Sequence, residues 1–479
     1  MKFLDIAQKS KFFKSSMFAN SIILFGMVPQ FFIVPLIISY WGEAEYTKYV
    51  TFLAIVNIFS QINAAMQNGY ILRLIPNIKF SVNELFSMSI LTVIMGIIAV
   101  IGLLMWSKYF ALKYESLFFT CVIFVVVLVF LLNSFKLILQ IGVSVLAPLL
   151  ISSLLSCITI ISVVCIIYLQ LENKVELIKI IVFSYAIIVF LSGMSSIFFI
   201  VNRGLVGTVS FKNILHNAGF LIRFGGLSLA VSSISNLFQN GTKIYLGTNY
   251  EANFLVDFNL SFTLCMISIQ FISPIIGLVF PYLTKEKFTK DKNLIWICNL
   301  HKIFWMFAII MYIGYSLLIS RVILLWLGSN YLYLNNSVCI FLYYFIFTQA
   351  ASIGVQYLKS VNRQILTLFA SIFSYFLVPS LIFVNLEKFD VYQCIYIFCI
   401  TGGVFYFIIS FILISITNQN LRMIKYYIPD AIFGCGSIFL LTLFSSISND
   451  DFHTKIISSF FILILMILRY RKNPITKMV

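Results

Sequence analysis

The stretch SLFFTCVIFVVVLVFLLNSF, residues 116–135, decides the fold class of this chain. It holds no charged residue, and its length of about 20 residues is what an α-helix needs to cross the hydrocarbon of a bilayer. Glu115 comes directly before it and Lys136 directly after it. Because lysine and arginine resist translocation, we expect the Lys136 end to face the cytoplasm and the Glu115 end to face the opposite side.

Similar apolar stretches follow one another along the chain. They cover residues 17–40, 49–71, 85–106, 116–138, 146–169, 177–200, 221–246, 254–280, 303–320, 336–358, 365–385, 391–416, 428–447 and 454–469. Their runs are continuous and not alternating, so they predict helices instead of the strands of a membrane barrel. The composition agrees: mean hydropathy is +1.03 and 10% of residues are charged, where soluble proteins have about a quarter. The sequence therefore predicts an all-α integral membrane protein with about 14 transmembrane helices.

The lysines and arginines are unevenly distributed over the connections between these stretches. More than two thirds of the 32 fall on alternate connections, within residues 2–14, 73–79, 136, 203–223, 285–302, 359–363, 422–425 and 469–477. The other connections carry most of the acidic residues. This asymmetry predicts a multi-pass protein with both termini in the cytoplasm. The formal net charge is +16, and we expect its lysines and arginines to interact with the anionic headgroups of membrane lipids. Nucleic-acid binding is not expected.

Residue types that carry catalysis or hold metals are scattered. The three histidines, His216, His301 and His453, are isolated from one another and from acids. The nine cysteines form no CxxC pair and are expected to act as small packing residues. No catalytic residue, metal ligand or cofactor is therefore predicted. The short connections leave no room for an extramembrane lobe, which favours transport or lipid handling over catalysis.

A weak internal repeat divides the chain. Residues 42–49 (GEAEYTKY) follow the first stretch, and residues 250–257 (YEANFLVD) follow the seventh. Each phrase places an acidic residue, an alanine and an aromatic before a long apolar helix. Six stretches separate the two phrases, so we expect two pseudo-symmetric halves related by an axis along the membrane normal. Duplicated bundles of this kind hold substrate at the interface of their halves.

Polar residues interrupt the seventh stretch at helical spacing. Ser232, Asn236, Gln239 and Lys243 follow one another at i, i+4, i+7 and i+11, and Asn240 lies beside them. This spacing places them on one helical face, which should turn away from lipid toward a cavity or a neighbouring helix. We interpret them as the lining of a substrate pathway. Packing between helices, and snorkelling of Lys243 to the outer interface, are the alternatives.

The second stretch repeats this pattern. Asn57, Gln61 and Asn68 share one helical face and are assigned to the same pathway. Arg73 follows at the predicted cytoplasmic end, and Arg223 lies at the start of the seventh stretch. Because a guanidinium fits phosphate oxygens, both arginines are candidates for the capture of a phosphate headgroup. The alternative is that they only add to the positive charge of the cytoplasmic side.

Asp257, early in the eighth stretch, is the one carboxylate that we expect inside the membrane. It could pair with Lys243, or it could bind a coupling proton or sodium ion. The alternative is an acid at the interface with neither role.

Several short phrases are spread along the chain in register: Pro35 followed by WGEAEY (41–46), LIRFGGL (221–227), KIYLG (243–247), GLVFPYLT (277–284) and LWLG (325–328). These phrases resemble those of the Wzx-type flippases, the O-antigen and polysaccharide repeat-unit translocases of the MOP (MATE-like) superfamily. The resemblance covers nearly the whole chain but contains no single diagnostic motif. Two positions depart from the family pattern: Ser228 stands where proline is common, and Thr242 stands where Asp or Asn is common.

The resemblance implies a flippase of the bacterial inner membrane for O-antigen, lipopolysaccharide or related polysaccharide synthesis. Its cargo would be an undecaprenyl-pyrophosphate-linked oligosaccharide, moved from the cytoplasmic to the periplasmic leaflet by alternating access. The fold implied has two six-helix bundles, 1–200 and 221–417, a cytoplasmic connecting loop at 201–220, and two additional helices with a cytoplasmic tail in 418–479. The second and seventh helices would face the central cavity. A polysaccharide polymerase and a chain-length regulator would be its protein partners.

Two other functions compete with this interpretation. A cation-coupled multidrug exporter of the same superfamily is expected to carry an acidic residue in its first helix, and residues 17–40 contain none. A polysaccharide polymerase or ligase is expected to have a long outer loop with basic residues, and the outer connections here are short. The flippase interpretation therefore leads.

Overall fold

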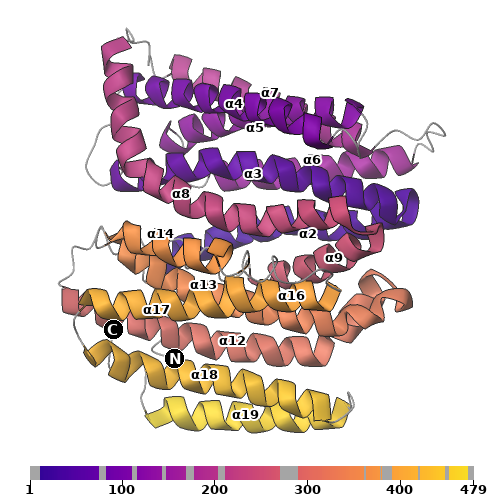
Figure 1. Ribbon diagram of the computed structural model, residues 1–479, viewed down its shortest axis with the longest axis vertical. Coiled ribbons are helices and arrows are strands. Elements are labelled where there is room, and N and C mark those ends of the chain that lie inside the picture. The colour runs from indigo at the N-terminus through magenta and orange to yellow at the C-terminus, as the bar shows by residue number, and fades with distance from the viewer. Residues whose placement is uncertain are drawn as a thin grey trace. The chain divides into compact units, whose positions relative to one another are not determined.

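The computed structural model describes residues 11–74, 82–110, 116–142, 147–168, 177–202, 211–269, 290–360, 363–377, 379, 391–418, 421–447 and 452–472. Within these ranges every regular element is a helix (Figure 1). Six of the described helical segments are long and apolar enough to cross a membrane: Leu117–Lys136, Leu150–Tyr168, Leu177–Asn202, Ile297–Trp326, Ser329–Lys359 and Gln393–Ile414. The prediction of an all-α membrane protein is confirmed.

Residues Phe18–Asn259 form one compact unit. Its helices are α2 (Lys11–Trp41), α3 (Glu43–Leu74), α4 (Val82–Phe110), α5 (Ser116–Gly142), α6 (Ala147–Tyr168), α7 (Leu177–Asn202), α8 (Phe211–Asn249) and the first part of α9 (Ala252–Ile269). Only Gly42 separates α2 from α3, and its φ of +85° lies in the left-handed region that glycine adopts without strain. Glu43 and Glu45 then occupy the first turn of α3, where a carboxylate favours the helix dipole.

Helix α5 holds the core of this unit together, and it packs against α3, α4, α6 and α7. Buried apolar residues of α5, α6 and α7 form a continuous cluster: Leu128, Leu132, Leu139, Ala147, Ile151, Ile188 and Val189. The buried Asn133 of α5 donates its amide hydrogen to the Ser60 carbonyl of α3 over 3.3 Å. Such interhelical bonds satisfy polar groups that water cannot reach. The outer faces of α4 and α7 expose apolar side chains, as a lipid-facing surface requires.

The second unit contains Leu260–Val479. Its helical elements are α12 (Lys290–Trp326), η1 (Ser329–Leu334), α13 (Asn335–Ser360), α14 (Gln364–Ile372), η2 (Phe373–Leu377), α16 (Val391–Cys399), η3 (Ile400–Phe405), α17 (Tyr406–Asn418), α18 (Leu421–Ile447) and α19 (Phe452–Lys472). Aromatic side chains fill its interior. Phe341 and Phe345 of α13 contact Phe262 at ring-centroid distances of 5.6 and 5.0 Å, and Phe398 lies 5.9 Å from Phe341 and 6.1 Å from Phe262. Pairs at this spacing add to the stability that burial alone gives.

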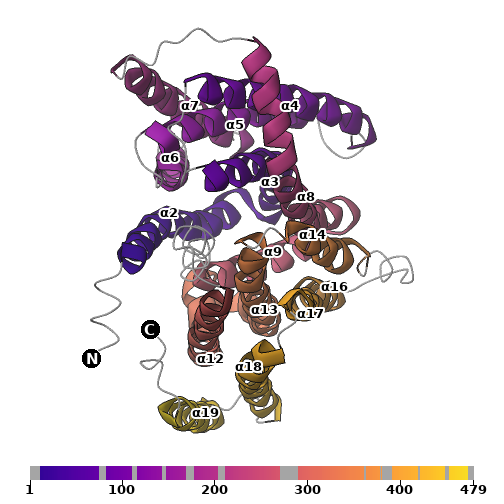
Figure 2. The ribbon, with the colours of Figure 1, turned by 90° about the vertical axis from the view of Figure 1, so that its left-hand side faces the viewer.

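Helices α18 and α19 pack against α12 in this unit (Figures 1 and 2). They form the last antiparallel pair of the chain. Helix α19 carries a row of exposed apolar side chains, and α18 exposes Ile432, Phe439 and Leu440, so these faces are suited to acyl chains.

Every predicted stretch overlaps a described helix, but several helices extend beyond it. Helix α8 begins at Phe211, ten residues before the predicted 221, and α12 begins at Lys290, before the predicted 303. The predicted connecting loop 201–220 is therefore helical from 211 onward. Hydropathy misses such extensions because polar residues interrupt the apolar run there. The predicted bundle boundaries at 200, 221 and 417 stay a prediction.

Candidate functional site

Helices α3 and α8 carry most of the predicted pathway residues and lie side by side (Figure 1). Asn236 of α8 is only 2% exposed, and its amide Nδ2 donates to the backbone carbonyls of Asn57 and Ile58 in α3, over 3.0 and 3.2 Å. Two neighbouring carbonyls of one helix thus accept from a single side chain of the other. The structure joins the second and seventh helices through this side chain.

Asn240 continues the contact one turn further along α8. It is buried, and its amide donates to the side-chain oxygen of Asn236 and to the Asn236 carbonyl. The bond to the side chain orients the Asn236 amide, because it occupies Oδ1 and leaves Nδ2 to face α3. Asn236 and Asn240 therefore act as a pair.

The two helices approach closely near the end of α8. A Cβ atom placed on Gly247 would lie 2.5 Å from Thr51 Oγ1 and 3.0 Å from Leu255 Cδ2. Glycine at 247 is what permits this approach. We name the line of contact from Asn236 to Gly247 on α8, against Thr51 to Ile58 on α3, the α3–α8 seam.

The repeated phrases lie just beyond this seam and contact one another. Thr47 Oγ1 donates to the Ala252 carbonyl over 3.1 Å, and Asn259 Nδ2 donates to the Tyr46 hydroxyl over 2.7 Å. Tyr46 is fully buried and Asn259 nearly so. Each phrase begins a helix directly after a short connection, so the sequence repeat marks two corners that pack together.

The side chains of Asn57 and Gln61 turn away from the seam. Both are exposed and stand one helical turn apart on α3. At about 100° per residue, Asn57 lies about 120° around the helix from Thr51, which faces Gly247. The residue that offers its carbonyl to Asn236 therefore presents its own amide to open space.

Ser232, Gln239 and Lys243 follow the seam on the α8 side and are partly exposed. With about 100° per residue, all three fall within about 60° of Asn236, and Lys243 within about 20°. The predicted stripe is thus a real face of α8. Its centre packs on α3, and Ser232, Gln239 and Lys243 remain accessible from the side.

The remaining predicted site residues are less well defined. Asp257 lies in the second turn of α9 and is partly exposed. The backbones of Asn68, Arg73 and Arg223 are helical, but their side chains lie outside the described residues. Their predicted roles, and that of Asp257 in ion coupling, stay predictions.

The sequence pattern did not single out one buried carboxylate, Asp430, which lies within α18 and is 6% exposed. It contacts Lys302 and Arg469, two residues that the sequence pattern assigned only to the positive cytoplasmic side. An isolated acid in an apolar stretch next to Pro429 was the signal that could have revealed it.

Across the described residues, no group of three or more His, Cys, Asp or Glu could hold a metal ion. Their nine cysteines are all free thiols.

No protein family and no curated protein sequence matches this chain. Solved structures do match its fold. A MATE structure in the straight conformation has a TM-score of 0.60 at 15% identity, covering 86% of this chain and 98% of that one. A MOP superfamily transporter from Pyrococcus furiosus has a TM-score of 0.59 at 14% identity, with 88% and 98% covered. An inward-facing multidrug resistance MATE transporter has a TM-score of 0.59 at 15% identity, with 85% and 95% covered. The chain therefore has the fold of MOP superfamily transporters.

Proposed function

We propose that this protein is an alternating-access transporter that translocates a lipid-linked oligosaccharide, with undecaprenyl pyrophosphate as the lipid carrier. The observation that carries the proposal is the exposed amide face of Asn57 and Gln61 beside the α3–α8 seam. In the proposed orientation both termini lie in the cytoplasm of a bacterial cell, and the cargo moves to the periplasmic leaflet of the inner membrane.

The argument begins with the cost of polar groups in lipid. An amide that loses its water without gaining a partner costs about 1–3 kcal/mol by protein mutational data. Asn57 and Gln61 are exposed on a helix whose neighbours are membrane-spanning segments. A water-filled space solvates them, whereas acyl chains do not. Amides that line such a space offer both donors and acceptors, which is what the hydroxyls of a sugar require.

The charge on the same helix pair fits the other part of the cargo. Lys243 lies on the seam face of α8 and is partly exposed. An ammonium is a compact cation with three donors and suits a pyrophosphate. Arg73 and Arg223 extend this role to the predicted cytoplasmic ends of the two helices, where a headgroup would be captured first. A pathway with amides for sugar and fixed cations for phosphate matches the two polar parts of the cargo.

A cation-coupled multidrug exporter is the second candidate, because multidrug resistance MATE transporters share the fold. The sequence of α2 argues against it, since residues 11–41 contain no Asp or Glu to bind a coupling ion. Asp257 would have to supply that role. An exporter of apolar drugs also has less use for the exposed amides of Asn57 and Gln61.

The test uses a strain that lacks the gene and carries it on a plasmid. We expect the double variant Asn57→Leu/Gln61→Leu to abolish surface polysaccharide while the protein still reaches the membrane. Asn249→Leu is the matched control, because Asn249 is also an exposed amide of the same helix pair but bonds only within α8. Normal surface polysaccharide in the double variant would refute the proposed site. Drug resistance conferred by the wild type, without any glycan phenotype in the deletion strain, would favour the exporter.

The proposed partners follow from the proposed cargo. A polymerase must join the delivered repeat units, and a chain-length regulator must limit that reaction. Both would act on the periplasmic face after translocation.

A further inference from the structure

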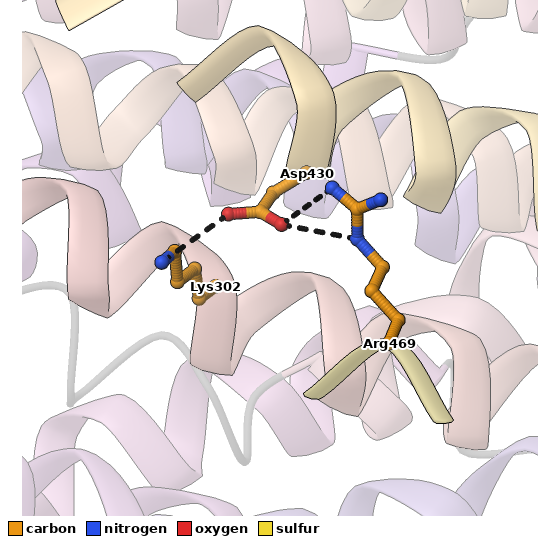
Figure 3. A network of polar contacts seen from close by, with 3 residues as sticks. All are labelled: Lys302, Asp430 and Arg469. Atoms are coloured by element: carbon orange, nitrogen blue, oxygen red, sulfur yellow. Dashed lines mark hydrogen bonds and ion pairs between the residues drawn. The ribbon is translucent and has the colours of Figure 1, made fainter. Parts of the chain in front are cut away.

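Three charged side chains from three helices meet in the unit that contains α12, α18 and α19 (Figure 3). Arg469 of α19 donates from Nε and Nη2 to one oxygen of Asp430 in α18, over 3.3 and 3.0 Å. Lys302 of α12 approaches the other oxygen of the same carboxylate at 3.8 Å. The guanidinium also lies 4.9 Å from the ring centroid of Phe433, which fixes its plane. We name this group the Lys302–Asp430–Arg469 cluster.

The cluster has one more positive charge than it has negative charge. Asp430 neutralises Arg469, with which it is hydrogen-bonded, and Lys302 is left at a longer distance. The Lys302 residue is 8% exposed, and its ammonium lies beyond hydrogen-bond distance from the carboxylate. Within the described part of the chain no side chain or carbonyl accepts from it at hydrogen-bond distance. An ammonium has three donors, so the cluster lacks both a negative charge and acceptor oxygens.

The position of the cluster indicates where the missing anion comes from. Asp430 lies in the first half of α18, Arg469 in the last turn of α19 and Lys302 in the first half of α12, so the three mark one end of this helix group. The distribution of lysine and arginine predicts that this end faces the cytoplasm. Lipid headgroups lie at this level of a membrane helix. From here, exposed apolar side chains run along α19 toward its other end: Ile467, Ile464, Phe461, Phe460 and Ile457.

We propose that the Lys302–Asp430–Arg469 cluster binds the phosphate of an anionic membrane phospholipid, whose acyl chains lie along the exposed apolar face of α19. The phosphate oxygens accept from Lys302 and from the Nη1 side of Arg469, and its charge balances the cluster. The apolar face distinguishes a phospholipid from free phosphate, because only a phospholipid has chains that cover it. This site is separate from the α3–α8 seam and does not depend on the cargo.

The test measures the thermal stability of the purified full-length protein in detergent with added lipid. Phosphatidylglycerol, phosphatidylcholine with the same acyl chains, and inorganic phosphate are the three probes. We expect phosphatidylglycerol to raise the apparent melting temperature by about 2–5 °C more than phosphatidylcholine does, because a ligand that binds only the folded state stabilises it. Inorganic phosphate should give a smaller shift than phosphatidylglycerol at equal concentration.

Lys302→Met is the first variant, and we expect it to lose the preference for phosphatidylglycerol. It leaves Asp430 and Arg469 as a neutral, hydrogen-bonded pair, so its folding should be preserved. Arg321→Met is the matched control, because Arg321 is an exposed cation near the other end of the same helix. This control should retain the preference.

Asp430→Asn is the second variant and separates a binding site from a merely structural ion pair. It leaves two cations and should make stability more dependent on phosphatidylglycerol than in the wild type. Three results would overturn the proposal: equal stabilisation of the wild type by both phospholipids, a full preference in Lys302→Met, or reproduction of the whole effect by inorganic phosphate.

Discussion

Replacing Asn236 by leucine tests whether the α3–α8 seam is held by the hydrogen bonds described above. The variant keeps the branched shape of the side chain, but it removes the two bonds to the Asn57 and Ile58 carbonyls and the acceptor that Asn240 uses. Interhelical hydrogen bonds in membrane proteins contribute about 0.6 kcal/mol each on average and up to about 1.7. The two interhelical bonds therefore predict a decrease of about 1–3 kcal/mol in the free energy of unfolding, to which the lost bond from Asn240 within α8 adds. The apolar side chain offsets part of this loss, so the lower end is expected.

The assay is reversible unfolding of the purified protein in mixed micelles, compared with the wild type under the same conditions. Asn249→Leu is the control and should change the free energy of unfolding by less than about 0.5 kcal/mol, because its bonds stay within one exposed helical turn. Asn236→Asp should be worse than Asn236→Leu, since a carboxylate would face two carbonyl oxygens. The reasoning is refuted if Asn236→Leu is as stable as the control, or if the aspartate variant is the more stable of the two.

Three further changes test the seam, the corner and the pathway. Gly247→Val places methyl groups against Thr51 and should lower the free energy of unfolding by about 1–3 kcal/mol. The double variant Gly247→Ala/Thr51→Ala should lose less free energy of unfolding than Gly247→Ala alone. Additive effects of the two substitutions would contradict the contact. Tyr46→Phe removes the hydroxyl that accepts from the buried Asn259 and should lower the free energy of unfolding by about 1–3 kcal/mol. Tyr245→Phe is the control, because Tyr245 is an exposed tyrosine of the same unit. Equal melting temperatures for the two variants would count against the bond. Lys243→Ala should abolish surface polysaccharide at normal membrane levels, whereas Lys48→Ala, which removes an exposed ion pair with Glu45, should not. Polymer in both strains would exclude Lys243 from the pathway.

The sequence predicts the helices well because a membrane span is a local property. A run such as 116–135 must be a helix in lipid, whatever its neighbours are, and α5 covers it from Ser116 to Gly142. Helix ends are less predictable, because the polar first turns of α8 have no apolar signature. The composition of 211–220 alone does not distinguish a helical turn in the headgroup region from a loop.

The candidate site was predictable in part. The polar stripes at Asn57 and Asn236 indicated two faces that avoid lipid, and the structure brings these two residues together. The direction of each side chain was not predictable, because it depends on how α3 and α8 cross. The Asn236 side chain is buried in the contact with α3, while the Asn57 side chain remains exposed.

The Lys302–Asp430–Arg469 cluster could not be predicted from the sequence, for a different reason. Its members come from three helices and lie far apart in the sequence. A periodic pattern reports on one helix at a time, so it cannot pair charges between helices. The uneven distribution of lysine and arginine explains Lys302 and Arg469 as cytoplasmic positive charges, so it gives no indication that both contact Asp430.

Residue 57 serves two purposes through different atoms. Its carbonyl holds α8 by accepting from Asn236, and every amino acid brings the same carbonyl; its side chain points elsewhere and stays exposed. Under the proposed function, mutation of this residue would change the contact with cargo and leave the hydrogen bond between the helices in place. A position built in this way would let the proposed transporter accept a different cargo while its helix packing stays intact.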